Sequence, residues 1–294
     1  MSVAVSHVTL PFFEDVLVLR VYTRTDATVS NCPAPVIVMC HDFIGVQGIL
    51  LPEVAQAFAR DGFVVVTFDY RGFGDSGGER GRLKVAAQQL DIREVMRWVR
   101  TNPVLDERRI GLWGTGLGGG HALCVAYQNP QVRCVVSQIP VLDGEALVTQ
   151  GMSSVDRAFF LIELEKREIR RRIDSNELWV SVSQLIRDQA SQQFLLQQLR
   201  ACPVMCTRMP YLTLRELRHF QASPFASGVE QPTLMVLAEH DHLTPDAQIR
   251  AVYDALAGGK SLYRVSGAEH YDLYRAPWRD EALQAQRAWF QTYL

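Results

Sequence analysis

The chain has 294 residues, of which 48% are hydrophobic and 21% charged, a balance typical of a globular protein with a substantial core. This length accommodates one large domain, or one domain with an inserted subdomain. The net charge of -2 supplies no basic field for nucleic acid, no apolar run approaches the roughly 20 residues of a membrane helix, and the N-terminus lacks a secretory signal pattern. We therefore expect a cytoplasmic protein that binds neither nucleic acid nor membrane.

The first 30 residues alternate apolar and polar side chains, for example at Val16, Val18 and Val21, and predict two antiparallel edge strands. From residue 36 onward, short apolar runs alternate with segments of helical periodicity. Continuous runs of Val, Ile and Leu are typical of strands that are buried on both faces of a parallel sheet. The predicted strands span residues 36–40, 64–69, 110–114, 133–139, 233–238 and 261–265.

Helical periodicity fills the intervals between these strands. One predicted helix carries its apolar face at Val85, Ile92, Met96 and Val99 and ends before Pro103. A second predicted helix, near the C-terminus, runs from about residue 278 to 293. The alternation of strands and helices predicts an α/β fold, with a mostly parallel central sheet and helices on both faces.

Residues 144–228 interrupt the alternation, because no strand pattern is visible there. Helical spacing relates Phe159, Ile162, Ile169 and Ile173, and also Leu178, Val182 and Leu185, while the arginines at 170–172 fall on an outward side. We interpret 144–228 as a helical cap, inserted into a core formed by 1–143 and 229–294. Such a cap would cover the carboxyl edge of the sheet, where open α/β sheets bind ligands.

Several apolar side chains of this cap are candidate substrate contacts, among them Phe159, Trp179 and Met209. Packing within the cap explains these residues equally well. Apolar cap faces are also compatible with a homodimer.

A glycine-dense turn at residues 111–121 follows an apolar strand and precedes a helix. Gly114 and Gly118 stand two residues on either side of Gly116, and this spacing permits a tight strand–turn–helix connection. The pattern is that of a nucleophile elbow, G-x-S-x-G, with glycine at the central position. The spacing also matches a dinucleotide-binding loop, but that motif is expected after the first strand of its sheet.

Three further segments follow predicted strands in the same way. Asp42, within His41-Asp42-Phe43, follows the strand at 36–40, Asp241 follows the strand at 233–238, and His270 follows the last strand. The chain order of elbow, acid and histidine is that of the α/β-hydrolases. The chain resembles this superfamily, and it is most similar to the capped serine-hydrolase branch with serine aminopeptidase-like and acyltransferase-like members.

The resemblance implies specific roles. Asp241 matches the triad acid and His270 the triad base, the backbone amides of Phe43 and Leu117 match the oxyanion-hole donors, and Gly116 stands at the nucleophile position. No metal or organic cofactor is implied. The expected substrate is a small organic ester, thioester or other carbonyl compound.

Two positions depart from the family pattern. Gly116 has no side chain, so the usual acyl-enzyme cannot form there. Asp42 stands where the family usually has glycine, and a carboxylate beside an oxyanion hole opposes the negative charge that develops during acyl transfer. Asp42 is interpreted as a turn residue bonded to its own backbone, as a partner of a cationic group, or as an acid or base.

Other nucleophiles are poorly supported by the sequence. Thr115 should point away from the cleft, and Cys40 is expected to be a buried strand thiol. The six cysteines are scattered, and we expect all of them to be reduced.

Three functions remain open at this point. The first is an enzyme that keeps His270 and Asp241 as an acid/base pair without a covalent intermediate, as a lyase, cyclase, carbon–carbon cleaving or water-activating enzyme. The second is a serine hydrolase or acyltransferase seen as a Ser-to-Gly variant at position 116. The third is a ligand-binding protein without catalytic activity.

Overall fold

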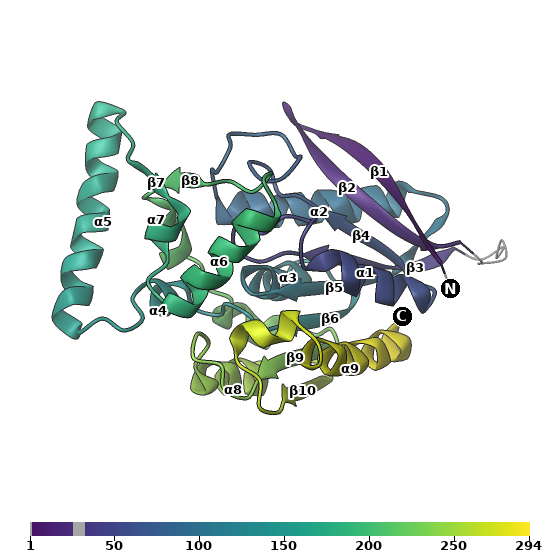
Figure 1. The fold of residues 1–294 in the computed structure, drawn as a ribbon. Helices are drawn as coiled ribbons and strands as arrows, with labels where there is room; N and C mark the ends of the chain where they lie inside the picture. The colour runs from purple at the N-terminus through teal and green to yellow at the C-terminus, as the bar shows by residue number, and fades with distance from the viewer. Residues whose placement is uncertain (1, 26–32) are drawn as a thin grey trace.

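The computed structural model describes residues 2–25 and 33–294 (Figure 1). An eight-stranded sheet runs through the molecule in the order β1-β2-β4-β3-β5-β6-β9-β10. The β1–β2 and β2–β4 pairs are antiparallel, and all other neighbours in this sheet are parallel. Its strands are β1 (Val3–Phe12), β2 (Asp15–Arg24), β3 (Ala34–Cys40), β4 (Val64–Phe68), β5 (Leu105–Thr115), β6 (Val132–Gln138), β9 (Thr233–Ala238) and β10 (Lys260–Val265).

The predicted α/β fold with a mostly parallel sheet is confirmed, and all six predicted parallel strands form. The largest difference in their bounds is at β5, which begins at Leu105 and not at residue 110. The start was missed because residues 106–109 are polar and give no apolar signal. The N-terminal strands are antiparallel as predicted, but only β1 is an edge strand. β2 lies between β1 and β4.

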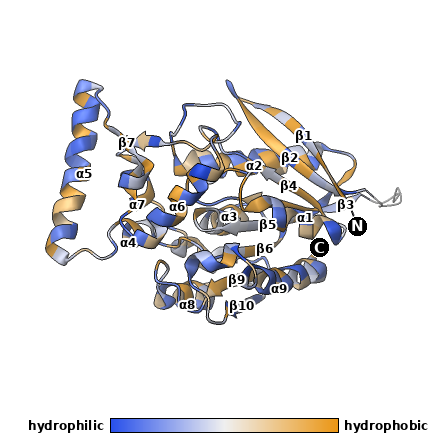
Figure 2. Cartoon of the chain, in the orientation of Figure 1, coloured by the Kyte–Doolittle hydropathy of each residue, from blue (hydrophilic) through white to orange (hydrophobic). Residues whose placement is uncertain are grey.

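Helices cover both faces of the sheet. Successive residues of β3 point to opposite sides, so Val36 and Val38 belong to one core cluster, while Ile37 and Met39 belong to the other. The first cluster includes residues of α2 (Val85–Thr101), α3 (Leu117–Tyr127) and α8 (Asp246–Ala255), and the second includes residues of α1 (Leu51–Arg60) and α9 (Trp278–Tyr293). These helices show both hydrophobic and hydrophilic stretches in Figure 2, as expected of helices with one buried face.

In the chain, the segment 144–228 follows β6 and precedes β9. In space it lies to one side of the sheet (Figure 1). The expectation that it holds helices without strands is corrected by a short antiparallel pair, β7 with β8. Strand β7 and the 3-10 helix η1 also replace the helix expected around Leu178, Val182 and Leu185. The elements of the segment are α4 (Gly144–Val148), α5 (Ser154–Asp174), β7 (Trp179–Ser181), η1 (Val182–Leu185), α6 (Gln189–Ala201), β8 (Arg208–Pro210), α7 (Thr213–Arg218) and η2 (Ser223–Gly228).

Helix α5 presents its longest apolar stripe to solvent. Phe159, Ile162, Ile169 and Ile173 share a helical face as predicted, but they are 51% to 75% exposed. The face that is buried carries Phe160, Leu164 and Glu168 instead. Both faces have helical spacing, so contact with neighbouring elements decides which one is covered.

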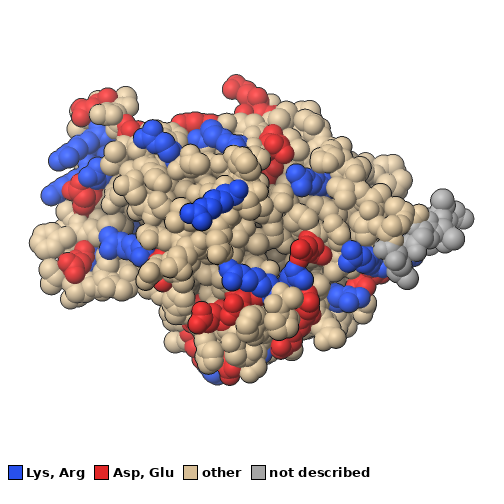
Figure 3. Space-filling model, viewed as in Figure 1, with Lys and Arg blue, Asp and Glu red and all other residues tan. Residues whose placement is uncertain are grey.

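Charged side chains are mixed over the surface seen in Figure 3, with a group of Lys and Arg over the upper end of α5. The arginines at 170–172 are in this helix, and Arg171 and Arg172 both pair with Glu168. Within the described part of the chain, no helix is long and apolar enough to cross a membrane.

Candidate active site

The turn between β5 and α3 has a backbone that only glycine adopts without strain. Gly116 has φ of 56° and ψ of -124°, and the left-handed half of φ space is unfavourable for residues with a Cβ. The connection is also tight, because a Cβ on Gly114 would lie 2.1 Å from the carbonyl oxygen of Gly118. Strand, turn and helix therefore follow the path that the glycine spacing predicts.

The loops after β9 and β10 bring Asp241 and His270 together. His270 Nδ1 lies 2.8 Å from Asp241 Oδ2, and both side chains are almost completely buried. The other oxygen of Asp241 accepts hydrogen bonds from the backbone amides of Leu243, at 2.8 Å, and Thr244, at 3.1 Å. Burial acts to raise the pKa of Asp241, but the hydrogen bond and charge of His270, together with these amides, hold that pKa below its usual value.

The loop after β3 places Asp42 against the turn at Gly116. Asp42 Oδ1 accepts hydrogen bonds from the backbone amides of Phe43, at 2.6 Å, and Leu117, at 2.7 Å. The two amides expected to form an oxyanion hole therefore converge on one point, and that point holds a carboxylate oxygen. Burial raises the pKa of Asp42, although these amides and His270 act in the opposite direction.

The two departures from the family pattern are complementary in space. A Cβ built on Gly116 would lie 1.9 Å from Asp42 Oδ1 and 2.1 Å from Asp42 Cγ. The carboxylate thus fills the volume that the side chain of a residue at position 116 would need. A serine at 116 and the observed position of Asp42 exclude each other.

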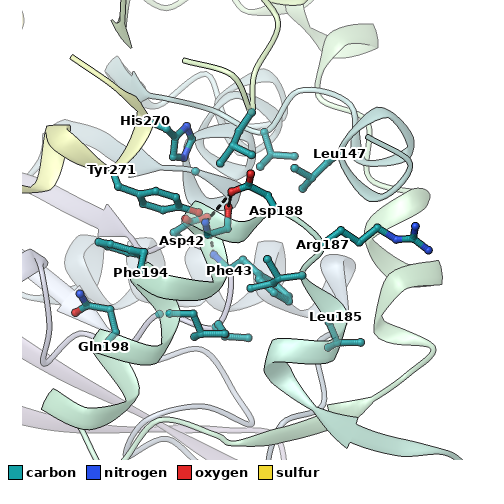
Figure 4. A pocket seen from close by; sticks show the side chains of 18 of the residues that line it. Asp42, Phe43, Leu147, Leu185, Arg187, Asp188, Phe194, Gln198, His270 and Tyr271 are labelled. Atoms are coloured by element: carbon teal, nitrogen blue, oxygen red, sulfur yellow. Dashed lines mark hydrogen bonds between the residues drawn. The ribbon is translucent and has the colours of Figure 1, made fainter. Parts of the chain in front are cut away.

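A cavity of about 560 Å³ opens above these residues, which is within the usual range for small-molecule sites. Asp42, Gly116 and His270 line it from the core (Figure 4). The segment 144–228 contributes mainly apolar side chains on the opposite side. They include Leu147, Val148, Leu185, Ile186, Phe194, Leu195, Met205 and Leu217. The polar lining residues of this segment are Gln150, Arg187, Asp188, Gln189, Ser191 and Gln198.

The three residues of segment 144–228 that were expected at the substrate are not among the residues that line this cavity. Phe159 is 69% exposed on the outer face of α5, and Met209 is fully buried in β8. Trp179 lies under the guanidinium of Arg82, which is 5.3 Å from its ring centroid. Their aromatic or apolar character therefore serves packing and surface contacts.

Other cavity residues were not predicted from the sequence. Tyr271 directly follows His270 and packs against it, with 4.8 Å between the ring centroids. Its position beside the histidine was the available signal. Phe194 and Asp188 lie in the segment without a motif, so no sequence signal distinguished them.

The alternative nucleophiles are placed unfavourably. Thr115 Oγ1 lies 2.8 Å from the hydroxyl of Tyr274 and does not line the cavity. Burial raises the pKa of the Cys40 thiol to about 12, so this thiol stays protonated. Cys40 and four other cysteines are free, whereas Cys32 lies outside the described residues. No group of three or more metal-ligating side chains is found among the residues that the structure describes.

Comparison with known proteins agrees with this architecture. The chain is 40% identical over 266 residues to an Escherichia coli protein described as the uncharacterized 31.7 kDa protein in the traX-finO intergenic region, and the match covers 90% of this chain and 93% of the relative. It is 32% identical over 127 residues to thiohydrolase aneE of Aspergillus aculeatus, which covers 42% of this chain and 40% of that protein.

Among solved structures, the DcsB complex with its substrate analogue superposes with a TM-score of 0.84 at 20% identity, covering 99% of this chain and 100% of the other. At that identity the likeness concerns the fold. A family model described as serine aminopeptidase, S33, matches residues 31–274. With its parallel sheet and strand-end loops, the chain belongs to this family of α/β-hydrolases.

Proposed function

We propose that the protein is an enzyme that uses His270, oriented by Asp241, as acid and base on a small organic ester, thioester or other carbonyl compound, without a serine nucleophile. The observation that carries this proposal is the buried pair itself. His270 and Asp241 lie 2.8 Å apart and His270 lines the cavity, whereas Gly116 offers no reactive atom. A ligand-binding protein has no need of this buried arrangement.

The geometry of the pair supports proton transfer. The hydrogen bond from Nδ1 to Asp241 fixes the orientation of the imidazole and leaves Nε2 as the atom that exchanges protons. In this role His270 removes a proton from water or from the substrate, and Asp241 stabilises the imidazolium that forms. The name of the matched thiohydrolase is consistent with hydrolysis of an activated acyl compound.

In this proposal the backbone amides of Phe43 and Leu117 donate their hydrogen bonds to Asp42 and not to the substrate. Their hydrogen bonds to Asp42 Oδ1 leave no room for a substrate oxygen at the same point. A substrate carbonyl would occupy this position only if Asp42 moved out. The site therefore differs in chemistry from a serine hydrolase that has merely lost its nucleophile.

We also propose that residues 144–228 act as a cap that binds the organic part of the substrate. This is supported by the apolar side chains that they present to the cavity, among them Phe194, Leu195 and Met205. Apolar area that is buried on binding contributes roughly 25 cal/mol per Å². The cavity therefore favours acyl groups with an apolar chain.

The test is turnover of acyl p-nitrophenyl esters and acyl N-acetylcysteamine thioesters of increasing chain length. His270→Ala should lower turnover by about 10²- to 10⁴-fold. The control is His240→Ala, which changes an exposed histidine in the loop after β9 and should leave turnover unchanged. A serine-directed fluorophosphonate should not label the protein. Equal turnover by the parent and His270→Ala would contradict the proposal, and tight acyl binding without turnover would support a binding protein instead.

A further inference from the structure

The carboxylate of Asp42 is held in an asymmetric way. Oδ1 takes both backbone hydrogen bonds, at 2.6 and 2.7 Å, while Oδ2 accepts none from the described residues. Asp42 also lines the cavity and is partly buried. One oxygen is therefore anchored by two amides, while the other accepts no hydrogen bond from the described residues in a side chain that lines the cavity.

This asymmetry has a chemical meaning. A carboxylate oxygen between two amide donors is in the position that becomes an oxyanion when the carbon beside it turns tetrahedral. Here that carbon is Cγ of Asp42. The two amides are therefore set to stabilise attack on Cγ, which is useful only if Cγ becomes part of an ester or an anhydride.

We propose that Asp42 is the covalent nucleophile of this site, and that its substrates are acyl thioesters. This inference rests on the proposed function, because it needs His270 to activate water. Asp42 thereby takes over the task of the missing side chain at position 116, from the opposite side of the same space.

In the first step Asp42 Oδ2 attacks the thioester carbonyl carbon. A bond forms between Oδ2 and the acyl carbon, the carbon–sulfur bond breaks, and the electron pair leaves with sulfur as a thiolate. The product is a mixed anhydride of the acyl group and Asp42. The thiolate takes its proton from solvent.

In the second step His270 takes a proton from water, and the resulting hydroxide adds to Cγ of Asp42. The negative charge moves onto Oδ1, where the amides of Phe43 and Leu117 hold it. The bond between Cγ and the original Oδ2 then breaks. The acyl group leaves as a carboxylate with that oxygen, and Asp42 is left as a carboxylic acid that carries the oxygen from water. Asp42 and His270 each release a proton to solvent, one of which replaces the proton taken up by the thiolate, so the net reaction is hydrolysis of the thioester to a carboxylate, a thiol and one proton.

The leaving group explains the preference for thioesters. A carboxylate is a weak base, with an ordinary pKa near 4 that burial raises in Asp42, so it displaces only groups that are themselves stable as anions. A thiol has a pKa of about 8.5, whereas an alkoxide is about as basic as hydroxide, whose parent water has a pKa of about 15.7. Anhydride formation is therefore feasible from a thioester and strongly unfavourable from an alkyl ester.

The first test is a single turnover of octanoyl N-acetylcysteamine in water labelled with ¹⁸O, with the protein in excess. The protein is then digested, and the masses of its peptides and of the octanoic acid are measured by mass spectrometry. We expect the heavy isotope in the peptide that contains Asp42 and not in the acid. Asp188, which lines the same cavity, and Asp241 serve as internal controls and should stay unlabelled.

Heavy oxygen in octanoic acid, with Asp42 unlabelled, would overturn the inference. It would also be overturned if thioesters from acetyl to lauroyl gave neither turnover nor labelled Asp42. The proposed function is judged separately, by the loss of turnover in His270→Ala. If His270→Ala loses turnover and the parent places the heavy oxygen in octanoic acid, the acid/base proposal stands and the nucleophile proposal fails.

A second test traps the anhydride. In His270→Ala the second step slows, so hydroxylamine added with the thioester should convert Asp42 into a hydroxamate. The same treatment of Asp42→Asn with His270→Ala should give no hydroxamate at this position. A hydroxamate on another carboxylate, or none on Asp42, would contradict the proposal.

Discussion

The two halves of the candidate site differ in how they relate to the family pattern. The loops after β9 and β10 keep an acid and a histidine in hydrogen-bond contact, at 2.8 Å. In the loops after β3 and β5, Gly116 supplies no side chain, and the carboxylate of Asp42 fills the space that such a side chain would need. One half keeps the acid and histidine in the expected contact, and the other places a carboxylate where a side chain at position 116 would lie.

This difference shows that Gly116 and Asp42 depend on each other sterically. Gly116 alone would leave an empty oxyanion hole, and Asp42 alone would collide with any side chain at 116. Together they give a filled and hydrogen-bonded arrangement. The rebuilt half is therefore a coherent structure, whose chemistry can be separated from that of the retained half by substitution.

The largest expected effect comes from reversing the exchange. Asp42→Gly with Gly116→Ser should create a serine nucleophile beside His270 and a vacant oxyanion hole. We expect p-nitrophenyl acetate hydrolysis to rise by on the order of 10³-fold over the parent, with covalent labelling by a fluorophosphonate. Gly116→Ser alone should show neither, because its Cβ collides with Asp42. Equal activity of the single and double variants would break the comparison.

A smaller loss is expected when the retained half is disturbed. Asp241→Asn removes the charge that stabilises the imidazolium of His270 and should lower thioester turnover by on the order of 10²-fold or more. Glu239→Gln is the matched control, because this exposed carboxylate bonds to Ser266 and Gly267 instead. Thioester kinetics of both variants check this prediction, and similar losses in the two would argue against a specific role of Asp241.

The two carboxylates should also affect stability with opposite dependence on pH. The pKa of Asp42 is raised in the folded protein, so its ionisation costs stability as the pH rises from about 4 through that pKa. The pKa of Asp241 is lowered, so its contribution is present at neutral pH and is lost as the pH falls through that pKa.

Melting temperatures of Asp42→Asn and Asp241→Asn between pH 3 and pH 7 measure this contrast. Relative to the parent, the melting temperature of Asp42→Asn should rise as the pH increases towards 7, because the variant has no buried carboxyl group to ionise at this position. The melting temperature of Asp241→Asn should fall relative to that of the parent over the same rise in pH. Parallel curves for the two variants would contradict the opposite pKa shifts of Asp42 and Asp241.

Much of the fold was predictable because it depends on local patterns. Buried parallel strands show as runs of Val, Ile and Leu, and residues 233–238 were predicted with the bounds that β9 has. The strands β7 and β8 were missed, since three residues are too few to show a period. The buried face of α5 was not predictable, because Phe159 and Phe160 both fit a helical spacing and only contacts with neighbouring elements distinguish them.

The site was predictable to a different degree in its two halves. Position after a strand was enough to select Asp241 and His270, because strand ends meet at one edge of a parallel sheet. The direction of the Asp42 side chain depends on the turn at Gly116, which is remote in sequence. The sequence showed both departures, but only the structure shows that one fills the space left by the other.

The most direct test of this account is a double-mutant cycle on the free energy of unfolding, with Asp42→Ala and Gly116→Ala. The backbone strain of an alanine at position 116 enters both arms of the cycle and cancels. We expect Gly116→Ala to be more destabilising in the parent, where Asp42 is present, than in the Asp42→Ala variant, with a coupling of about 1–3 kcal/mol. Additivity within about 0.5 kcal/mol would contradict the claim that Asp42 occupies the space of the missing side chain.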